Sequence, residues 1–384
     1  MLSCALRGDV SKASDQRREV IHKRQNDAIH SIVTHTFPTL WLDKTFASVF
    51  DPPKPAALGP LVPEAPTGVG TAERLVALLT SSAVRKGSLA EMQFGQCFPD
   101  LLCKVGQCVR AAKPVQLTLM AFPFKVPNPA KVGPRQMPDL AELAALVRLH
   151  RLNEKVKSVY PPGLEIHVIH DGSYIADIFG VTLEEVRRYE AYFARLVRAA
   201  RAETFLHLHD LQALWSRSAG AFAQKATCPD KAMLDWRPSR QEWNKQFSKT
   251  LGMINLRSLP ATEVSRLLDQ AASGQLPPEY RDLEQAVHAA MLRYYERDSL
   301  LHTNDPRPVC FPDAIHATTQ CRSRRLAIWL VSRGNSLLPW HGVGVIQLGG
   351  KWSVAVARDV LLNPSYEPVF LEGEDTPFFY RQVA

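Results

Sequence analysis

The sequence has few of the features that mark secreted, metal-binding or redox proteins. Its seven cysteines are an odd number scattered along 384 residues, and none forms a Cys-x-x-Cys pair. This usage argues against a disulfide framework and is typical of free thiols in a reducing compartment. Cys97, Cys103 and Cys108 stand close together, but apolar residues surround them without acidic or histidine companions. We therefore expect them to pack in a core, and we expect no metal site.

Long hydrophobic runs are also absent. No segment is long and apolar enough for a signal peptide or a membrane span, so we expect a soluble, cytoplasmic protein. The net charge of +8 is modest, and basic residues are interleaved with acidic ones nearly everywhere. Such a balance suits an anionic small substrate at least as well as a nucleic acid. Hydrophobic residues make up 46% of the chain, which is ample for a large core.

The chain divides into an extension and a main domain. Residues 11–50 have the apolar spacing of a helix, and residues 51–70 are crowded with proline and glycine. We therefore expect residues 1–70 to form an N-terminal helical extension with a proline-rich linker. Residues 71–384 would then be the main domain.

Apolar patterns in the main domain alternate between strand and helix. The expected order is strand 115–124, helix 138–160, strand 164–169, an extended segment 174–177, helix 182–200 and strand 204–210. This alternation predicts a Rossmann-like α/β fold with a mostly parallel sheet, followed by a helical insertion over 218–303 and further strands over 324–358. No Gly-x-Gly-x-x-Gly follows the first strand, so a dinucleotide cofactor is not indicated.

Polar residues gather where the expected strands end, which is where parallel α/β sheets bind ligands. The clusters are Lys125 with Lys131, His170 with Asp171, Asp210, and Trp340 with His341. Their shared position at one edge of the sheet is the main indication of a site.

Lys125 stands in a loop stiffened by prolines at 123, 127 and 129. Partial burial lowers the pKa of a lysine from about 10.4 and frees an amine that can attack or polarise a carbonyl. The other interpretation, an ordinary charge partner such as a phosphate contact, is the commoner role of a loop lysine. The residues alone favour the charge partner.

The other candidate site residues can also be explained by an ordinary structural role. Asp171 precedes a glycine and is by default a turn residue, whereas Asp177 lies beside apolar residues and needs a partner or a function. His316 and His341 have side chains suited to proton transfer near neutrality. The basic segment 322–325 is either a phosphate clamp or a solvated loop. The basic and aromatic segment 236–249 resembles a nucleic-acid surface only weakly.

Several separated motifs, taken in order, resemble the isocyanide (isonitrile) synthases of the pyoverdine/dityrosine biosynthesis family. They span roughly residues 90 to 358. The motifs are Ala-Phe-Pro-Phe-Lys-Val-Pro-Asn at 121–128, Lys-Val-Gly at 131–133, Pro-Asp-Leu-Ala-Glu at 138–142, Tyr-Pro-Pro-Gly at 160–163, Asp171-Gly172 with Asp177, Phe-Pro-Asp at 311–313 with Ile315-His316, and Pro-Trp-His-Gly-Val at 339–343.

The resemblance implies a Rossmann-like enzyme that converts the α-amine of tyrosine or tryptophan into an isocyanide. The added carbon would come from C2 of ribulose 5-phosphate, with no cofactor, and an iron- and 2-oxoglutarate-dependent oxygenase is a frequent neighbour in the pathway. The sequence departs from the family pattern at Val126, where serine is usual, at His170, also in place of serine, and at Ala317-Thr318, where proline is usual. These changes bear on the substrate side chain more than on the reaction.

The resemblance also suggests roles for the candidates. Lys125 would polarise the ketone or hold the substrate anion, in a bolder version through a lysine imine, and Asp171, Asp177, His316 and His341 would transfer protons. Lys131 and Arg324 would contact the phosphate, Trp340 would wall the aromatic pocket, and Asp210 would bind substrate. Two rival readings stay open, namely a Schiff-base lyase or aldolase acting on a sugar phosphate, and a non-enzymatic module that binds RNA or a phosphorylated ligand. The sequence does not indicate an oligomeric state.

Overall fold

The computed structural model describes residues 70–222, 239–271, 276–320, 325–331, 335, 337–371 and 374–383. The expected extension therefore lies outside the described residues, apart from Gly70. Arg324, with most of the basic segment 322–325, lies outside them too.

The main sheet has five strands and is wholly parallel. These are β1 (Val115–Met120), β2 (Leu164–His170), β3 (Leu206–Asp210), β4 (Ile315–Thr318) and β5 (Leu326–Ala327), in the spatial order β3-β2-β1-β4-β5. The first three strands along the chain run in space from β1 at the centre to β3 at one edge of the sheet, and β4 then pairs with the other side of β1. This confirms the predicted mixed α/β class, and it puts the reversal of strand order between β1 and β4.

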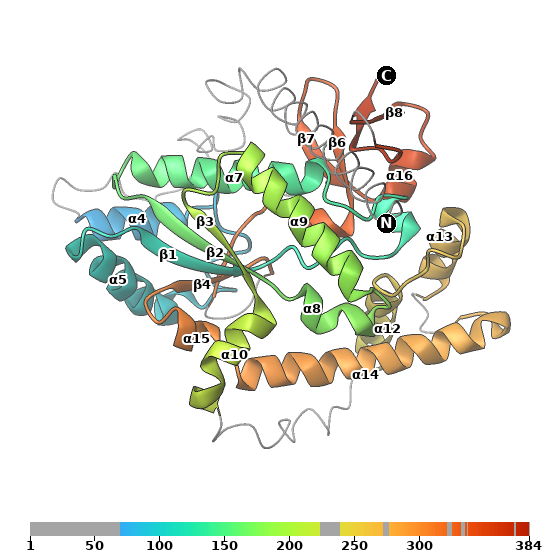
Figure 1. Cartoon of the computed structure of the whole chain (residues 1–384), viewed down its shortest axis with the longest axis horizontal. Coiled ribbons are helices and arrows are strands. Elements are labelled where there is room, and N and C mark those ends of the chain that lie inside the picture. The colour runs from blue at the N-terminus through green and yellow to red at the C-terminus, as the bar shows by residue number, and fades with distance from the viewer. Residues whose placement is uncertain are drawn as a thin grey trace, which may run out of the picture.

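Two helices connect the first three strands. α7 (Leu140–Lys157) links β1 to β2, and α9 (Leu183–Ala199) links β2 to β3. Each begins with a capping box in which the side chain of the N-cap residue accepts a backbone hydrogen bond, Asp139 with Glu142 and Thr182 with Glu185. Figure 1 shows α7 and α9 on one side of the strands and the long helix α14 (Arg281–Thr303) along the other side of the molecule.

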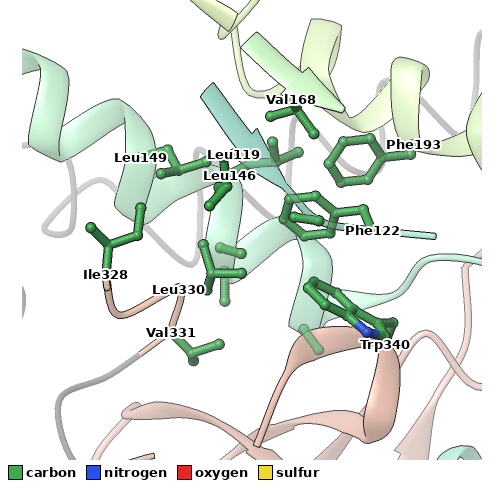
Figure 2. Packing of buried hydrophobic residues seen from close by; sticks show 14 of the residues in the cluster. Leu119, Phe122, Leu146, Leu149, Val168, Phe193, Ile328, Leu330, Val331 and Trp340 are labelled. Atoms are coloured by element: carbon green, nitrogen blue, oxygen red, sulfur yellow. The ribbon is translucent and has the colours of Figure 1, made fainter. Parts of the chain in front are cut away.

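Apolar side chains from all these layers meet in one core. Figure 2 shows Leu119 and Val168 of the strands facing Leu146 and Leu149 of α7, with Phe193 of α9 beside them. At the end of β1 the same core continues through Phe122 and Trp340, both buried. The core therefore extends directly into the edge of the sheet where ligands are expected.

A second sheet lies apart from the first, with the strand order β7-β6-β9-β8. Its strands are β6 (Val343–Ile346), β7 (Trp352–Ala355), β8 (Tyr366–Val369) and β9 (Phe379–Gln382). The remaining elements are α4 (Thr71–Leu79), α5 (Phe94–Arg110), α6 (Pro129–Val132), α8 (Gly172–Ile175), η2 (Ala176–Ile178), α10 (Leu211–Phe222), α12 (Arg240–Leu251), α13 (Ala261–Gln270), η4 (Pro278–Tyr280), α15 (Arg307–Cys310), η5 (Pro339–His341) and α16 (Ala357–Leu361). No helix among the described residues is long and apolar enough to cross a bilayer.

Two local predictions were wrong. Residues 174–177 are helical and not extended, because the backbone carbonyl oxygen of Asp171 accepts hydrogen bonds from the backbone N–H groups of Tyr174 and Ile175 and starts a helix. Strand β4 was missed, although it supplies a central neighbour of β1. The strands β6 and β7 were expected, but they form an antiparallel pair in the second sheet.

Candidate active site

A cavity of about 160 Å³ opens at the reversal of strand order. Its walls come from the segments that follow β1 and β4, from the start of α8, from α12 and α14, and from η5. Parallel α/β sheets bind ligands at this topological switch point, beyond the carboxyl ends of the strands. Segments nearly 200 residues apart in the sequence therefore build one cavity.

The loop after β1 forms an aromatic wall. Phe122 has a φ of 58°, a left-handed conformation that costs a non-glycine residue about 1–2 kcal/mol. Its ring stacks on Phe193 with centroids 4.3 Å apart and meets the edge of Trp340 at 5.2 Å. Its carbonyl oxygen accepts a hydrogen bond of 2.8 Å from His170 Nδ1. Trp340 and the following loop residue Phe124 line the cavity.

Lys125 is 1% exposed and does not line the cavity, although Phe124 and Val126 do. Its Nζ lies 3.0 Å from both Asp139 Oδ2 and Glu142 Oε2. The same Nζ donates to the carbonyl oxygens of Pro339 at 2.9 Å and Gly342 at 2.8 Å. The prolines thus stiffen the loop, but the amine points into the protein interior. Lys125 joins the start of α7 to the turn that carries Trp340 and His341.

The carboxylates of Asp139 and Glu142 both pair with the single ammonium group of Lys125. Burial raises the pKa of Glu142 to about 7, while Lys125 opposes this shift and Asp139 adds to it. Glu142 also accepts a hydrogen bond of 3.1 Å from the buried Tyr189 hydroxyl. The resulting network is desolvated and connects the loop after β1 to α7 and α9.

Asp171 lines the cavity at the end of β2. Burial raises the pKa of its carboxyl group to about 6, and the nearby Asp298 carboxylate adds to this shift while Arg307 opposes it. A carboxyl group with such a pKa can both accept and return a proton near neutral pH. Asp171 is therefore suited to acid–base chemistry.

His341 also lines the cavity. Burial lowers its pKa well below the usual value, and the positive charges of Lys131, Lys249 and Lys125 lower it further. The imidazole is therefore neutral at physiological pH and has one N–H donor and one acceptor nitrogen.

Lys131 lies near His341 but does not line the cavity. Burial lowers the pKa of its amine to about 8, and the charges of Lys249 and Arg358 contribute in the same direction. Of the two lysines predicted from the loop, Lys131 is the one without a carboxylate ion pair among the described residues.

Three other predicted residues lie away from the cavity lining. His316 hydrogen-bonds through Nδ1 to Thr118 Oγ1 at 2.8 Å, and burial with the charge of Arg307 lowers its pKa to about 4. Asp177 is exposed and pairs with Arg293 and Arg297 in a separate groove. Asp210 accepts hydrogen bonds from Ser173 Oγ at 2.6 Å and from the backbone N–H of Ala213 at 2.8 Å. Asp177 and Asp210 are thus held by local structural contacts.

Sequence reasoning missed several charged residues of the cavity. Lys249 of α12, Asp298 of α14, and Asp305 with Arg307 after α14 all line it. Arg307 is buried and donates from Nη2 to Asp305 Oδ2 at 2.6 Å. The sequence does contain one indication of Asp305 and Arg307. The segment Asn304-Asp305-Pro306 predicts the end of a helix, at the point where the chain leaves the helical insertion and returns to the sheet.

The described residues contain no group of three or more histidine, cysteine, aspartate or glutamate side chains arranged to hold a metal ion. The cavity instead combines an aromatic wall with carboxylates, a neutral imidazole and several cations. This arrangement can bind a small polar molecule beside an aromatic one and move protons between them.

Comparison with known proteins gives concordant matches. A family model described as pyoverdine/dityrosine biosynthesis protein matches residues 105–267. An L-tyrosine isonitrile synthase from Xenorhabdus nematophila is 27% identical over 286 residues, covering 71% of this chain and 79% of that protein. Isocyanide synthase xanB from Aspergillus fumigatus is 39% identical over 296 residues, covering 71% of this chain and 37% of that longer protein. An L-tryptophan isonitrile synthase, AmbI1 from Fischerella ambigua, is 34% identical over 108 residues, which are 28% of this chain and 33% of that protein.

The fold has a solved counterpart. The crystal structure of the PvcA protein from Pseudomonas aeruginosa superposes with a TM-score of 0.58 at 21% sequence identity, covering 82% of this chain and 100% of that chain. At this identity the match supports the fold alone. The family model and the sequence relatives, apart from this structural match, identify the chain as similar to the pyoverdine/dityrosine biosynthesis proteins, and the names of these relatives support an enzyme of the isonitrile synthase kind.

Proposed function

We propose that the chain converts the α-amine of an aromatic L-amino acid, tyrosine or tryptophan, into an isocyanide with C2 of ribulose 5-phosphate as the carbon source. The observation that carries the proposal is the cavity at the switch point, where an aromatic wall faces Asp171, His341 and a set of cations. The names of relatives that act on tyrosine and on tryptophan support both amino acids. The catalytic domain would comprise residues 71–384.

The amino-acid substrate would lie with its ring against Phe124 and Trp340. Asp171 would accept a proton from the substrate ammonium group, because an amine must be neutral to attack a ketone. Condensation with C2 releases water and gives an imine. Cleavage of the C1–C2 bond would then release C1 as formaldehyde, and cleavage of the C2–C3 bond would release C3–C5, after protonation at C3, as a three-carbon triol phosphate, so that C2 remains on nitrogen as the isocyanide carbon without any oxidant or reductant. His341 would transfer protons during these steps, while Lys125 holds the turn that carries it.

We also propose four site residues that the cavity lining does not include. His316, Asp177 and Asp210 lie away from the lining, and Arg324 lies outside the described residues. A downstream iron- and 2-oxoglutarate-dependent oxygenase would consume the isocyanide product. We expect the enzyme to work in the cytoplasm without a cofactor, and we expect no nucleic acid or membrane partner.

Mass spectrometry tests the proposed reaction. Purified protein is incubated with ribulose 5-phosphate carrying carbon-13 at C2 and, in separate reactions, with tyrosine or tryptophan. The expected product contains one labelled carbon and has two hydrogens fewer than the amino acid. Consumption of the sugar phosphate without an amino acid would instead support a lyase, and binding without turnover would support a binding module.

A further inference from the structure

The loop after β1 is anchored on both sides of the residues that line the cavity. On one side, the carbonyl oxygen of Phe122 accepts the hydrogen bond of 2.8 Å from His170 Nδ1, at the end of β2. On the other side, the backbone N–H of Val126 donates to the carbonyl oxygen of Trp340 at 3.0 Å. Phe124 lies between these two contacts and lines the cavity. The place of the aromatic wall therefore depends on how this short segment is held.

His170 is a buried histidine whose ring makes one hydrogen bond among the described residues. The ring is 3% exposed as part of its residue and packs edge-to-face on Phe193, with centroids 5.6 Å apart. Burial lowers the pKa of His170 below its usual value, so the ring is neutral at pH 7. A carbonyl oxygen can only accept a hydrogen bond, so the hydrogen of the neutral ring lies on Nδ1. Nε2 is then a bare acceptor, and it has no hydrogen-bond partner among the described residues.

Phe122 needs an anchor because its backbone is strained. Its φ of 58° is unusual for a bulky residue, and such conformations persist only where the surroundings hold them. The turn places the Phe122 ring in the core, beside Phe193, while the next two residues, Pro123 and Phe124, line the cavity (Figure 2). Relaxation of the turn would therefore move Phe124 from its place in the wall.

A second contact from the end of β2 supports the same segment. A Cβ atom at Gly172 would lie 2.2 Å from the carbonyl oxygen of Pro123 and 3.0 Å from its carbonyl carbon. This close approach is the reason for glycine, because Gly172 does not belong to the described glycines with a positive φ. Asp171 stands between the two contacts and lines the cavity. The residues on either side of Asp171 thus hold the loop that carries the aromatic wall.

We propose that His170 is a positioning residue that sets the aromatic wall, and with it the affinity of the enzyme for the aromatic ring of its substrate. The identity of that substrate as an aromatic amino acid rests on the proposed function. His170 does not line the cavity, so it acts through Phe122 and Phe124. Its loss should weaken the binding of the ring equally in the ground state and in the transition state. Such a change raises KM and leaves kcat nearly unchanged.

Steady-state kinetics with tyrosine and with tryptophan in the labelled assay test this role. His170→Leu replaces the ring by an apolar side chain of similar size, and we expect it to raise KM about tenfold while kcat changes less than about threefold. His170→Asn places an amide nitrogen where Nδ1 lies, so it should restore KM to within about threefold of the wild type. His207→Leu is the matched control, because His207 lies on β3 and does not line the cavity.

Gly172→Ala tests the second contact. We expect it to raise KM as His170→Leu does, because the new Cβ displaces the carbonyl group of Pro123. Gly95→Ala is the control, because a Cβ at Gly95 meets nothing within 4 Å. Equal KM values in these two variants would contradict the proposal, since the loop would then not rest on the end of β2.

Nitrogen-15 NMR of protein labelled at histidine reads the hydrogen bond without any substrate. The signals of His170 are those that disappear in His170→Asn. We expect them to be those of a neutral ring protonated at Nδ1 and to stay unchanged from pH 7 to 9. A ring protonated at Nε2 would overturn the proposal, because Nδ1 could then not donate to Phe122.

The kinetics and the spectrum separate failure of the anchor from failure of the proposed reaction. A wild-type KM in His170→Leu, or a KM in His170→Asn as high as in His170→Leu, would overturn the positioning role. Thermal melting of each variant confirms that it is folded. If the wild type converts neither amino acid, the proposed substrates fail, and the histidine spectrum alone decides whether His170 anchors the loop.

Discussion

At the scale of single residues, Lys125 and Lys131 stand in the same proline-rich loop but have different surroundings. The first is fully buried against two carboxylates and two carbonyl oxygens, and the second lies among like charges. Prolines predict that a loop is stiff, because they fix φ. They do not predict which side of the loop faces the core, since that depends on partners such as Pro339 and Gly342, which lie 214 and 217 residues away.

The position of Lys125 predicts a large effect on stability. Lys125→Met should lower the free energy of unfolding by about 3–5 kcal/mol, because it leaves two buried carboxylates without their counter-charge. Urea unfolding at pH 7 measures this loss, and Lys113→Met, at an exposed lysine, is the control. A variant that kept wild-type stability but lost all turnover would instead support a reactive amine at Lys125.

Asp171 predicts a pH dependence of the reaction. If its carboxylate accepts the proton of the substrate ammonium group, kcat/KM should fall as the pH drops through about 6, where burial has placed the pKa of Asp171. Asp171→Asn should lower kcat/KM by about 10²–10⁴-fold and remove this acidic limb. The profile is measured with the labelled assay from pH 5 to 9. If Asp171→Asn showed the same fall of kcat/KM at acidic pH, the titrating group responsible for that fall would be a residue other than Asp171.

At the scale of elements, strands and helices with clear periodicity were predictable and strand partners were not. The two capping boxes and the apolar faces of α7 and α9 follow from local sequence. β4 has only four residues with a mixed pattern, Ile-His-Ala-Thr, and acquires its strand form by pairing with β1. The pattern of β6 predicts a strand, but nothing local shows that it pairs with β7 and β9 in a separate sheet.

The contact between α7 and β6 depends on Gly344. A Cβ at this position would lie 2.5 Å from Leu140 Cβ and 2.7 Å from the backbone nitrogen of Ala141. Gly344→Ala should therefore lower the free energy of unfolding by about 1–3 kcal/mol, the usual cost of overpacking a core. Chemical denaturation of this variant and of Gly95→Ala makes the comparison. Equal stability of the two variants would mean that α7 and the second sheet are not packed as tightly as described.

At the scale of the whole molecule, the site depends on topology. The sequence predicted that polar residues would gather at the carboxyl ends of the strands, and Asp171, Trp340 and His341 do line one cavity there. The contributions of α12 and α14 could not be predicted, because the pattern of an amphipathic helix does not show which part of the molecule it covers. Residues such as Lys249 and Asp298 were missed for this reason.

The described residues that line the cavity all lie between Met120 and His341. A chain of residues 70–384 should therefore retain the kcat/KM of the full-length protein in the labelled assay. Circular dichroism of both chains controls for folding. Loss of turnover in a folded, shortened chain would assign a catalytic role to the N-terminal extension.

The long-range contacts of the site also set an order of events during synthesis. β1 ends at residue 120, but its neighbour β4 begins at residue 315, and the carbonyl partners of Lys125 are 214 and 217 residues away. At roughly 5–20 residues per second, a ribosome needs roughly 10–40 s to make the missing segment. During that interval one edge of β1, with its apolar side chains, has no strand to pair with. We therefore expect the nascent chain to depend on chaperones and its yield to rise when expression is slowed.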